Sequence, residues 1–365
     1  MAGSGFFLVL LAMTSDAGAL YLERRTTENA ADASSLAVAS FCALGSPECV
    51  SSTSLAFNAQ EFANLNSSDG QASLDLLCGF SPLSACASTA IAKCKPVPTS
   101  IQRYARVLVS TKNSDGSSSV STPFLNALLD EENSSATSQS CSQSAWGKAG
   151  SARVLLPLAI TICDYQSEGF KILRDYRSQL EVCPTTIRDI QGFALAPQPT
   201  KLINGWAIFA PTNQQLLCLE PQNLTVGMSI DTLPPGAERC NDSGISGSDS
   251  KRVLANFISA NLGKKVFIPV IASTSGTGNG SAQRVTSNVV GFFTFVFYGY
   301  DLGSQIKDGC GQYSCSEFNG QSAAQCGSQS ACIWGKFSRG IVAGAPVSRD
   351  TTFPPVGAQA VELLQ

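Results

Sequence analysis

The chain has 365 residues, of which 44% are hydrophobic and only 14% are charged, against a usual charged share of about 25%. The net charge of −3 excludes wholesale nucleic-acid binding, because neutralising phosphates requires clustered Lys and Arg. The absence of histidine excludes Ser-His-Asp hydrolysis, Cys-His proteolysis and His-ligated zinc or haem.

The N-terminal segment begins with an apolar run, GFFLVLLAMTSDAGALY at residues 5–21, which contains one acidic residue, Asp16. This run fits neither a membrane span of about 20 apolar residues nor a signal peptide, which starts with basic residues. Neither Pro nor Gly occurs between Leu22 and Leu44, and Gly45 and Pro47 form a stop signal. The sequence therefore predicts one continuous helix over residues 5–44.

Small residues form a stripe on this predicted helix, because Ala30, Ala33 and Ala37 recur at helical spacing. Such residues let helices approach closely, both in membranes and in bundles. We expect these alanines, together with Leu8 and Leu11, to lie in helix–helix contacts, most of them with other copies of the chain. Simple membrane anchoring of a monomer is the alternative.

Asp16 needs a partner if it is buried as a carboxylate. In a single membrane-anchored copy no positive charge would offset the cost of burying this carboxylate. In a helical assembly it could pair with a cation of a neighbouring copy. The candidates are Arg24, Arg25 and a freed N-terminal amine. We therefore hypothesise that Asp16 sets the axial stagger between copies, the alternative being a position at the membrane–water boundary.

The chain contains an even number of cysteines without a CxxC pair, and the low charge suits an extracellular surface. This usage predicts up to seven disulfides formed in an oxidising compartment. The expected local pairs are Cys42–Cys49, Cys163–Cys183 and Cys218–Cys240, with Cys310–Cys332 nested around Cys315–Cys326. The full set is Cys42, Cys49, Cys78, Cys86, Cys94, Cys141, Cys163, Cys183, Cys218, Cys240, Cys310, Cys315, Cys326 and Cys332.

The rest of the chain predicts a short mixed segment followed by a β-rich region. Strands are expected at 103–110, 153–163, within 190–220, and in the apolar stretches VFIPVIAS and NVVGFFTFVFYGYDL, with a helix at 251–262. Ser-rich pieces, such as SSATSQSCSQS, are expected to be exposed loops. Five loop-like sequons are possible glycosylation sites: Asn66, Asn133, Asn223, Asn241 and Asn279.

Catalytic and ligand-binding patterns are weak. No pair of carboxylates has a spacing that suits acid–base catalysis, and the Gly-rich stretch at 275–281 joins two strands instead of opening a helix. The sequence therefore predicts a non-enzymatic protein with no cofactor, no metal and no small-molecule substrate.

Residues 16–33 read DAGALYLERRTTENAADA and resemble the N-terminal signature of TadE/TadG-like proteins of the Tad (tight adherence) pilus system. In that family an Asp-Leu/Val-Gly element is followed by a Tyr, an Arg pair and Gln-Asn-Ala-Ala-Asp-Ala. Ala17 and Glu28 depart from it. The stretches 156–165, 265–270 with 291–296, and 332–339 are similar to the actinobacterial-type branch, in which a Cys-containing extracellular region follows the helix.

This resemblance implies a pilin-like subunit of a bacterial cell-surface filament, inserted in the cytoplasmic membrane before assembly. Its partners would be copies of itself or other pilins, and Tyr21, Arg24 and Arg25 would belong to its assembly helix. A monomeric envelope protein, acting as assembly factor or adhesin, is the alternative. The expected fold class is α+β: a long helix at 1–45, a Cys-containing mixed segment at 46–150 and a β-rich domain at 151–365.

Overall fold

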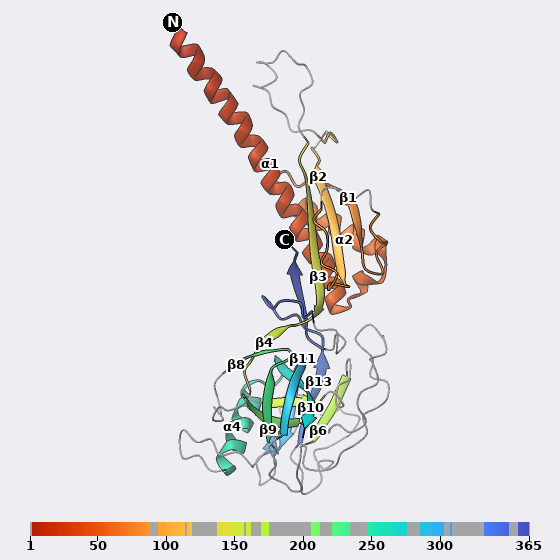
Figure 1. Cartoon of the computed structure of the whole chain (residues 1–365), viewed down its shortest axis with the longest axis vertical. Helices are drawn as coiled ribbons and strands as arrows, with labels where there is room; N and C mark the ends of the chain where they lie inside the picture. The colour runs from red at the N-terminus through yellow and green to blue at the C-terminus, as the bar shows by residue number, and fades with distance from the viewer. Residues whose placement is uncertain are drawn as a thin grey trace. The chain divides into compact units, whose positions relative to one another are not determined.

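The computed structural model divides the chain into two compact units (Figure 1). Unit 1 comprises Met1–Trp146 and Val361–Gln365, and unit 2 comprises Gly147–Ala360. The expected boundary at 150 therefore falls near the junction, but the N-terminal helix belongs to the same unit as the segment after it. The structure describes residues 2–87, 94–113, 115–118, 137–156, 158–161, 169–174, 206–211, 221–233, 247–275, 285–302, 307–308, 332–349 and 357–364.

The first element is a single helix, α1 (Ala2–Leu44), as the sequence predicted. It ends where the sequence changes to Gly-Ser-Pro, because Gly45 adopts a positive φ of 57° that favours glycine. The Gly45 amide donates to the Cys42 carbonyl at 3.1 Å, and the Ser46 amide donates to the Phe41 carbonyl at 2.9 Å. These two bonds form a Schellman motif, which satisfies carbonyls at the end of the helix.

Unit 1 places two helices on one face of an antiparallel sheet. The short η1 (Pro47–Val50) leads into α2 (Ser52–Leu65), whose N-terminus is capped by the Ser51 side chain, which accepts from the Ser54 amide at 3.2 Å. The sheet order is β1-β2-β3-β14. Its strands are β1 (Ala72–Gly79), β2 (Tyr104–Thr111), β3 (Gln139–Lys148) and β14 (Gln359–Leu363).

Strand β3 lies where the Ser-rich composition predicted an exposed loop. Its first half is part of the Ser-rich stretch that was expected to be an exposed loop, yet Ser142, Gln143 and Ser144 are buried. The hydroxyls of a Ser-rich strand can be buried where they find hydrogen-bond partners in the fold. Helix α2 was also not expected, since the sequence analysis gave this region only as a short mixed segment.

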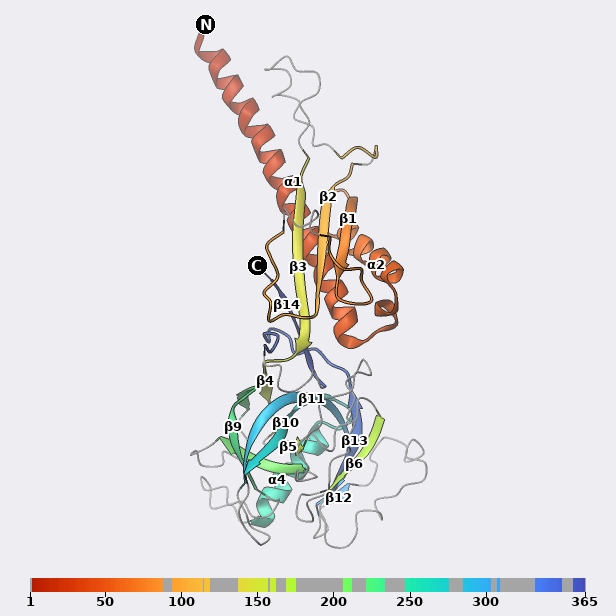
Figure 2. The same cartoon turned by 45° about the vertical axis from the view of Figure 1, so that its right-hand side comes forward.

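Unit 2 is built around strands that close on themselves (Figure 2). A ring is formed by five strand pairs: β10–β5, β5–β7, β7–β9, β9–β11 and β11–β10. On the other side, β13 pairs with β11, and β6 pairs with β13. The bounds are β5 (Leu158–Thr161), β6 (Gly169–Arg174), β7 (Trp206–Pro211), β9 (Ser229–Leu233), β10 (Lys265–Ser275), β11 (Val285–Asp301) and β13 (Cys332–Ser338). The β10–β5 contact that completes the ring is short, since it pairs only Val270 with Ile160 and Ile271 with Thr161.

The core of unit 2 lies between these strands and one helix. The rings of Phe293, Phe295 and Phe337 meet edge to face at centroid distances of 5.0–5.2 Å. Helix α4 (Gly247–Ala260) adds Leu254 and Ile258 to the same cluster. The predicted helix at 251–262 and the two apolar strands β10 and β11 are thus confirmed.

Three smaller strands also lie among the described residues of unit 2. β4 (Ser151–Val154) pairs antiparallel with β8 (Gln222–Thr225), and β12 (Lys307–Asp308) pairs with the end of β11. The stretch expected as one strand at 153–163 therefore holds parts of two, β4 and β5. In its described part the chain is α+β, with an N-terminal helix, mostly strands after it, and disulfides.

Candidate functional site

Helix α1 has two halves in different surroundings. We call residues 2–29 the projecting half and residues 30–44 the docked half, because the first part of the helix extends beyond the sheet (Figures 1 and 2). Of the side chains described between residues 11 and 29, only Asp16 and Thr27 are buried. Leu11, Met13, Tyr21 and Leu22 are large, apolar in most of their surface, and exposed.

A polar collar, which we define as Tyr21, Arg24, Arg25 and Glu28, surrounds the end of the projecting half. Arg24 Nε lies 3.1 Å from Glu28 Oε1, and Arg25 Nη1 lies 3.6 Å from Glu28 Oε2. Arg25 Nε also donates to the Tyr21 hydroxyl at 3.1 Å, and its guanidinium lies 5.4 Å from the centre of the Tyr21 ring. The hydrogen bond with Tyr21 raises the pKa of Arg25 further above its usual value. The collar is thus exposed but held in a defined arrangement.

Asp16 is the one acidic side chain of the projecting half that is buried. It is only 5% exposed, and it takes part in an interaction within the chain. Its pairing with a cation of a neighbouring copy, and its role in setting the axial stagger between copies, stay predictions.

The docked half packs on its own unit through small side chains. Ala30 and Ala31 are fully buried in one cluster with Ala63 of α2 and with Val107 and Val109 of β2. The Ser34 hydroxyl lies 2.8 Å from the carbonyl oxygen of Ala59, so the backbones of α1 and α2 approach closely. Small side chains at the contact permit this approach.

A buried serine cluster joins the docked half to strand β3. The Ser35 hydroxyl lies 2.9 Å from the Ser142 hydroxyl and 2.8 Å from the Ser144 hydroxyl. Both strand serines point to the helix-covered face, since side chains alternate along a strand. This cluster explains why a Ser-rich segment forms the third strand of the sheet.

The predicted contact residues of α1 are therefore divided between the two halves. Ala30 and Ala37 are buried against their own chain, whereas the sequence analysis expected most of the contacts from other copies. Ala33 is partly exposed, and Leu11 is exposed. The side chain of Leu8 lies outside the described part of the chain. Contacts between copies stay a prediction.

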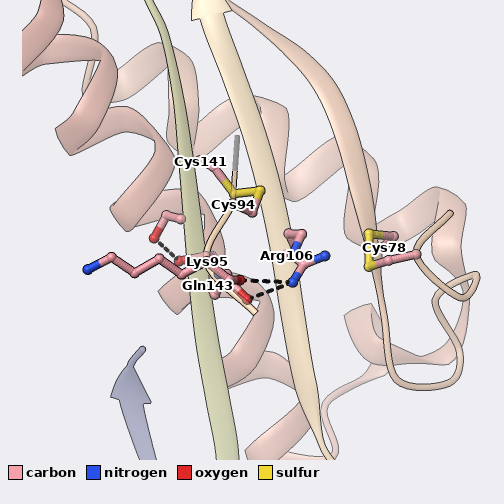
Figure 3. The surroundings of a disulfide bond; sticks show 9 residues. Cys78, Cys94, Lys95, Arg106, Cys141 and Gln143 are labelled. Carbon is pink, nitrogen blue, oxygen red and sulfur yellow. Dashed lines mark hydrogen bonds between the residues drawn. A yellow bond between two sulfur atoms is a disulfide. The ribbon is translucent and has the colours of Figure 1, made fainter. Parts of the chain in front are cut away.

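The face of the sheet opposite the helices carries two disulfides and a buried guanidinium (Figure 3). Cys78–Cys86 and Cys94–Cys141 lie on either side of Arg106, which is 3% exposed. Arg106 Nη2 donates to the Lys95 carbonyl at 3.2 Å and to Gln143 Oε1 at 3.0 Å. Gln143 Nε2 donates to the same carbonyl at 2.7 Å.

This arrangement fastens residues 94–95 onto β2 and β3 by one disulfide and two hydrogen bonds, and a third hydrogen bond joins Arg106 of β2 to Gln143 of β3. The hydrogen bonds of Arg106 and Gln143 join segments of unit 1 to one another. They therefore stabilise the sheet on which the docked half of α1 lies. Sequence reasoning did not single out Arg106, because the only local signal is an arginine in an otherwise apolar strand.

The remaining predicted sites are partly visible. Cys42–Cys49 closes the end of α1 as the sequence predicted, and Cys332 is disulfide-bonded. The other cysteines of the expected pairs, Cys163, Cys183, Cys218, Cys240, Cys310, Cys315 and Cys326, lie outside the described residues. Among the sequons, Asn66 follows α2, and Asn223 lies in strand β8 instead of the expected loop; both are exposed. Asn133, Asn241 and Asn279 lie outside the described residues.

The described residues contain no group of three or more Cys, Asp or Glu side chains arranged to hold a metal ion. Within the same residues, no helix has both the length and the apolar character needed to cross a membrane. No protein-family model, no curated protein and no solved structure matches this chain.

Proposed function

We propose that this chain is a non-enzymatic, pilin-like subunit of a bacterial Tad-type cell-surface filament, and that it assembles through the projecting half of α1. Its partners are copies of itself or other pilins. It is held in the cytoplasmic membrane before assembly and faces the outside of the cell afterwards. The disulfides of the described part suit that oxidising environment.

The observation that carries this proposal is the exposed apolar surface of the projecting half. An isolated helix is marginal in water unless an apolar face packs against something. Leu22 is 66% exposed, and Leu11 and Met13 are also exposed within the isolated chain. A neighbouring helix would cover these side chains and would stabilise the part of α1 that its own unit does not.

The TadE/TadG-like signature supports the proposal by its position across the two halves. Its Ala30 and Ala31 are explained by the fold, because they are fully buried beneath α2 and the sheet. Its Tyr21, Arg24 and Arg25 are exposed and contact only their own helix in the hydrogen bonds and ion pairs found for them. The fold does not require these three side chains, so we assign them to assembly.

Proline at Ala17 tests the proposal. Ala17 is exposed in the projecting half, and Pro there removes a backbone hydrogen bond and kinks the helix. We expect Ala17→Pro to abolish filaments, as seen by negative-stain microscopy of material from cells producing the full chain. The matched control is Ala17→Ser, which keeps the amide and should assemble.

Two measurements make this test decisive. The free energy of unfolding of the Ala17→Pro chain should remain near that of the unmodified protein, because the docked half is untouched. Filaments of normal yield from that variant would contradict the proposal. A detergent-purified protein that stays monomeric and is absent from filaments would support the alternative, a membrane-anchored assembly factor or adhesin.

A further inference from the structure

Helix α2 presents an apolar stripe to solvent on the side away from α1 and the sheet. Phe57 is 70% exposed and Leu65 is 72% exposed, and Val50 in the preceding η1 is 76% exposed. Phe57, Glu61 and Leu65 are spaced by four residues, so they lie on one face of the helix. We call Val50, Phe57, Glu61 and Leu65 the α2 stripe. The opposite face of α2 buries Leu55, Ala59 and Ala63.

The sequence on both sides of the stripe carries charges of one sign only. Residues 26–92 contain six acidic residues (Glu28, Asp32, Glu48, Glu61, Asp69 and Asp75) and neither Lys nor Arg. Glu61 is exposed in the middle of the stripe. A partner surface that suits the stripe must therefore combine apolar side chains with positive charge.

The projecting half of α1 holds such a surface. Arg24 and Arg25 are the only Lys or Arg residues among the first 92, and they follow directly after Tyr21 and Leu22. All four side chains are exposed within the isolated chain. Tyr21 and Leu22 match the apolar side chains of Phe57 and Leu65. Arg24 and Arg25 match the carboxylate of Glu61, which lies between those two.

We propose that the α2 stripe of one copy is the docking surface for residues 21–25 of a second copy. This inference rests on the proposed function, since it names the surface that receives the projecting half. The two surfaces are different patches of the same chain, so the contact is head-to-tail. Repetition of such a contact builds an open filament when the rotation between copies does not close a ring.

The ion pairs inside the collar do not prevent this contact. Arg24 and Arg25 share Glu28, and the side chains of both arginines are mostly exposed. Exposed pairs of this kind are weak and screened by salt. One arginine can keep Glu28 while the other binds Glu61 of the neighbouring copy.

Charge reversal in the full-length chain tests the contact. Glu61→Arg and Arg25→Glu each place like charges together, which disfavours an interface. We expect each variant alone to lower filament yield by about tenfold, and the combined variant to restore most of the yield. Asp115→Lys, an exposed acidic residue in the turn after β2, is the matched control and should assemble normally.

A photo-reactive phenylalanine analogue at Phe57 gives a second measurement. In filaments it should cross-link to a peptide that contains residues 21–25 of another copy. Cross-linking elsewhere, or unchanged yield in both single charge-reversal variants, would overturn the inference. Those results would leave the proposed function standing as long as Ala17→Pro still abolishes filaments, whereas assembly of Ala17→Pro would overturn the function itself.

Discussion

The two halves of α1 share one continuous helix but differ in what surrounds them. In the docked half, Ala30, Ser34 and Val38 have no exposed surface, and a disulfide closes the end of the helix at Cys42. In the projecting half, Leu22 and Met13 are exposed. Tertiary packing and covalent bonding therefore stabilise the docked half, whereas Asp16 and Thr27 are the only buried side chains among those described between residues 11 and 29 of the projecting half.

This difference separates folding from assembly along a single element. Substitutions in the docked half should change the free energy of unfolding, because its side chains are part of the core of unit 1. Substitutions in the projecting half should change assembly and leave unfolding nearly unchanged. The following variants measure how sharp this division is, beginning with the largest expected effect.

Removing the Cys94–Cys141 disulfide should weaken the sheet beneath the docked half most strongly. Its cysteines are 47 residues apart in sequence, and loop-closure entropy for such a separation predicts a loss of about 4 kcal/mol in the double Ser variant. The Cys42–Cys49 cysteines are separated by 7 residues, so replacing both with Ser should lower the free energy of unfolding by only about 2.5 kcal/mol. Denaturant unfolding of both variants measures the difference, and equal losses would contradict the loop-length explanation.

Enlarging a small side chain at the α1–α2 contact should have the next largest effect. Ala30→Leu adds three carbon atoms where Ala30 is fully buried, and overpacking of this kind costs about 1–3 kcal/mol. Ala19→Leu makes the same change at an exposed position of the projecting half and should alter the free energy of unfolding by less than about 0.5 kcal/mol. Similar losses at both positions would show that the projecting half is also packed within the chain.

The smallest expected effect is that of the serine cluster. Ser35→Ala removes the hydroxyl that lies between Ser142 and Ser144 and should cost about 1 kcal/mol in the free energy of unfolding. Ser15→Ala is the matched control at an exposed position of the same helix. If Ser35→Ala were neutral, the two strand serines would have to satisfy each other.

The long helix was predictable because its signals are local. Uninterrupted helix-forming residues and the Gly-Ser-Pro stop define its length and its end, and the nearby Cys42–Cys49 pair followed from sequence spacing. The apolar strands β10 and β11 were also predictable, since their phenylalanines and valines indicate burial without reference to any partner.

The missed elements depend on partners that are distant in the sequence. Strand β3 is Ser-rich and reads as a loop until Ser35, more than one hundred residues earlier, supplies hydrogen bonds. The burial of Arg106 depends on a carbonyl at Lys95 and on Gln143. Helix α2 did have a local signal, the Ser51 cap and a run without Gly or Pro, which could have been read.

The last strand has a consequence for how the protein is made. β14 lies beside β3 in the sheet of unit 1, and the Leu364 amide donates to the Gln143 carbonyl at 2.8 Å. In chain order, however, this strand comes after residues 147–358 of unit 2. A ribosome must therefore finish unit 2 before unit 1 can obtain its fourth strand. A nascent chain that stops early lacks that strand, so the four-stranded sheet on which the docked half of α1 lies can form only after the residues of unit 2 have been synthesised.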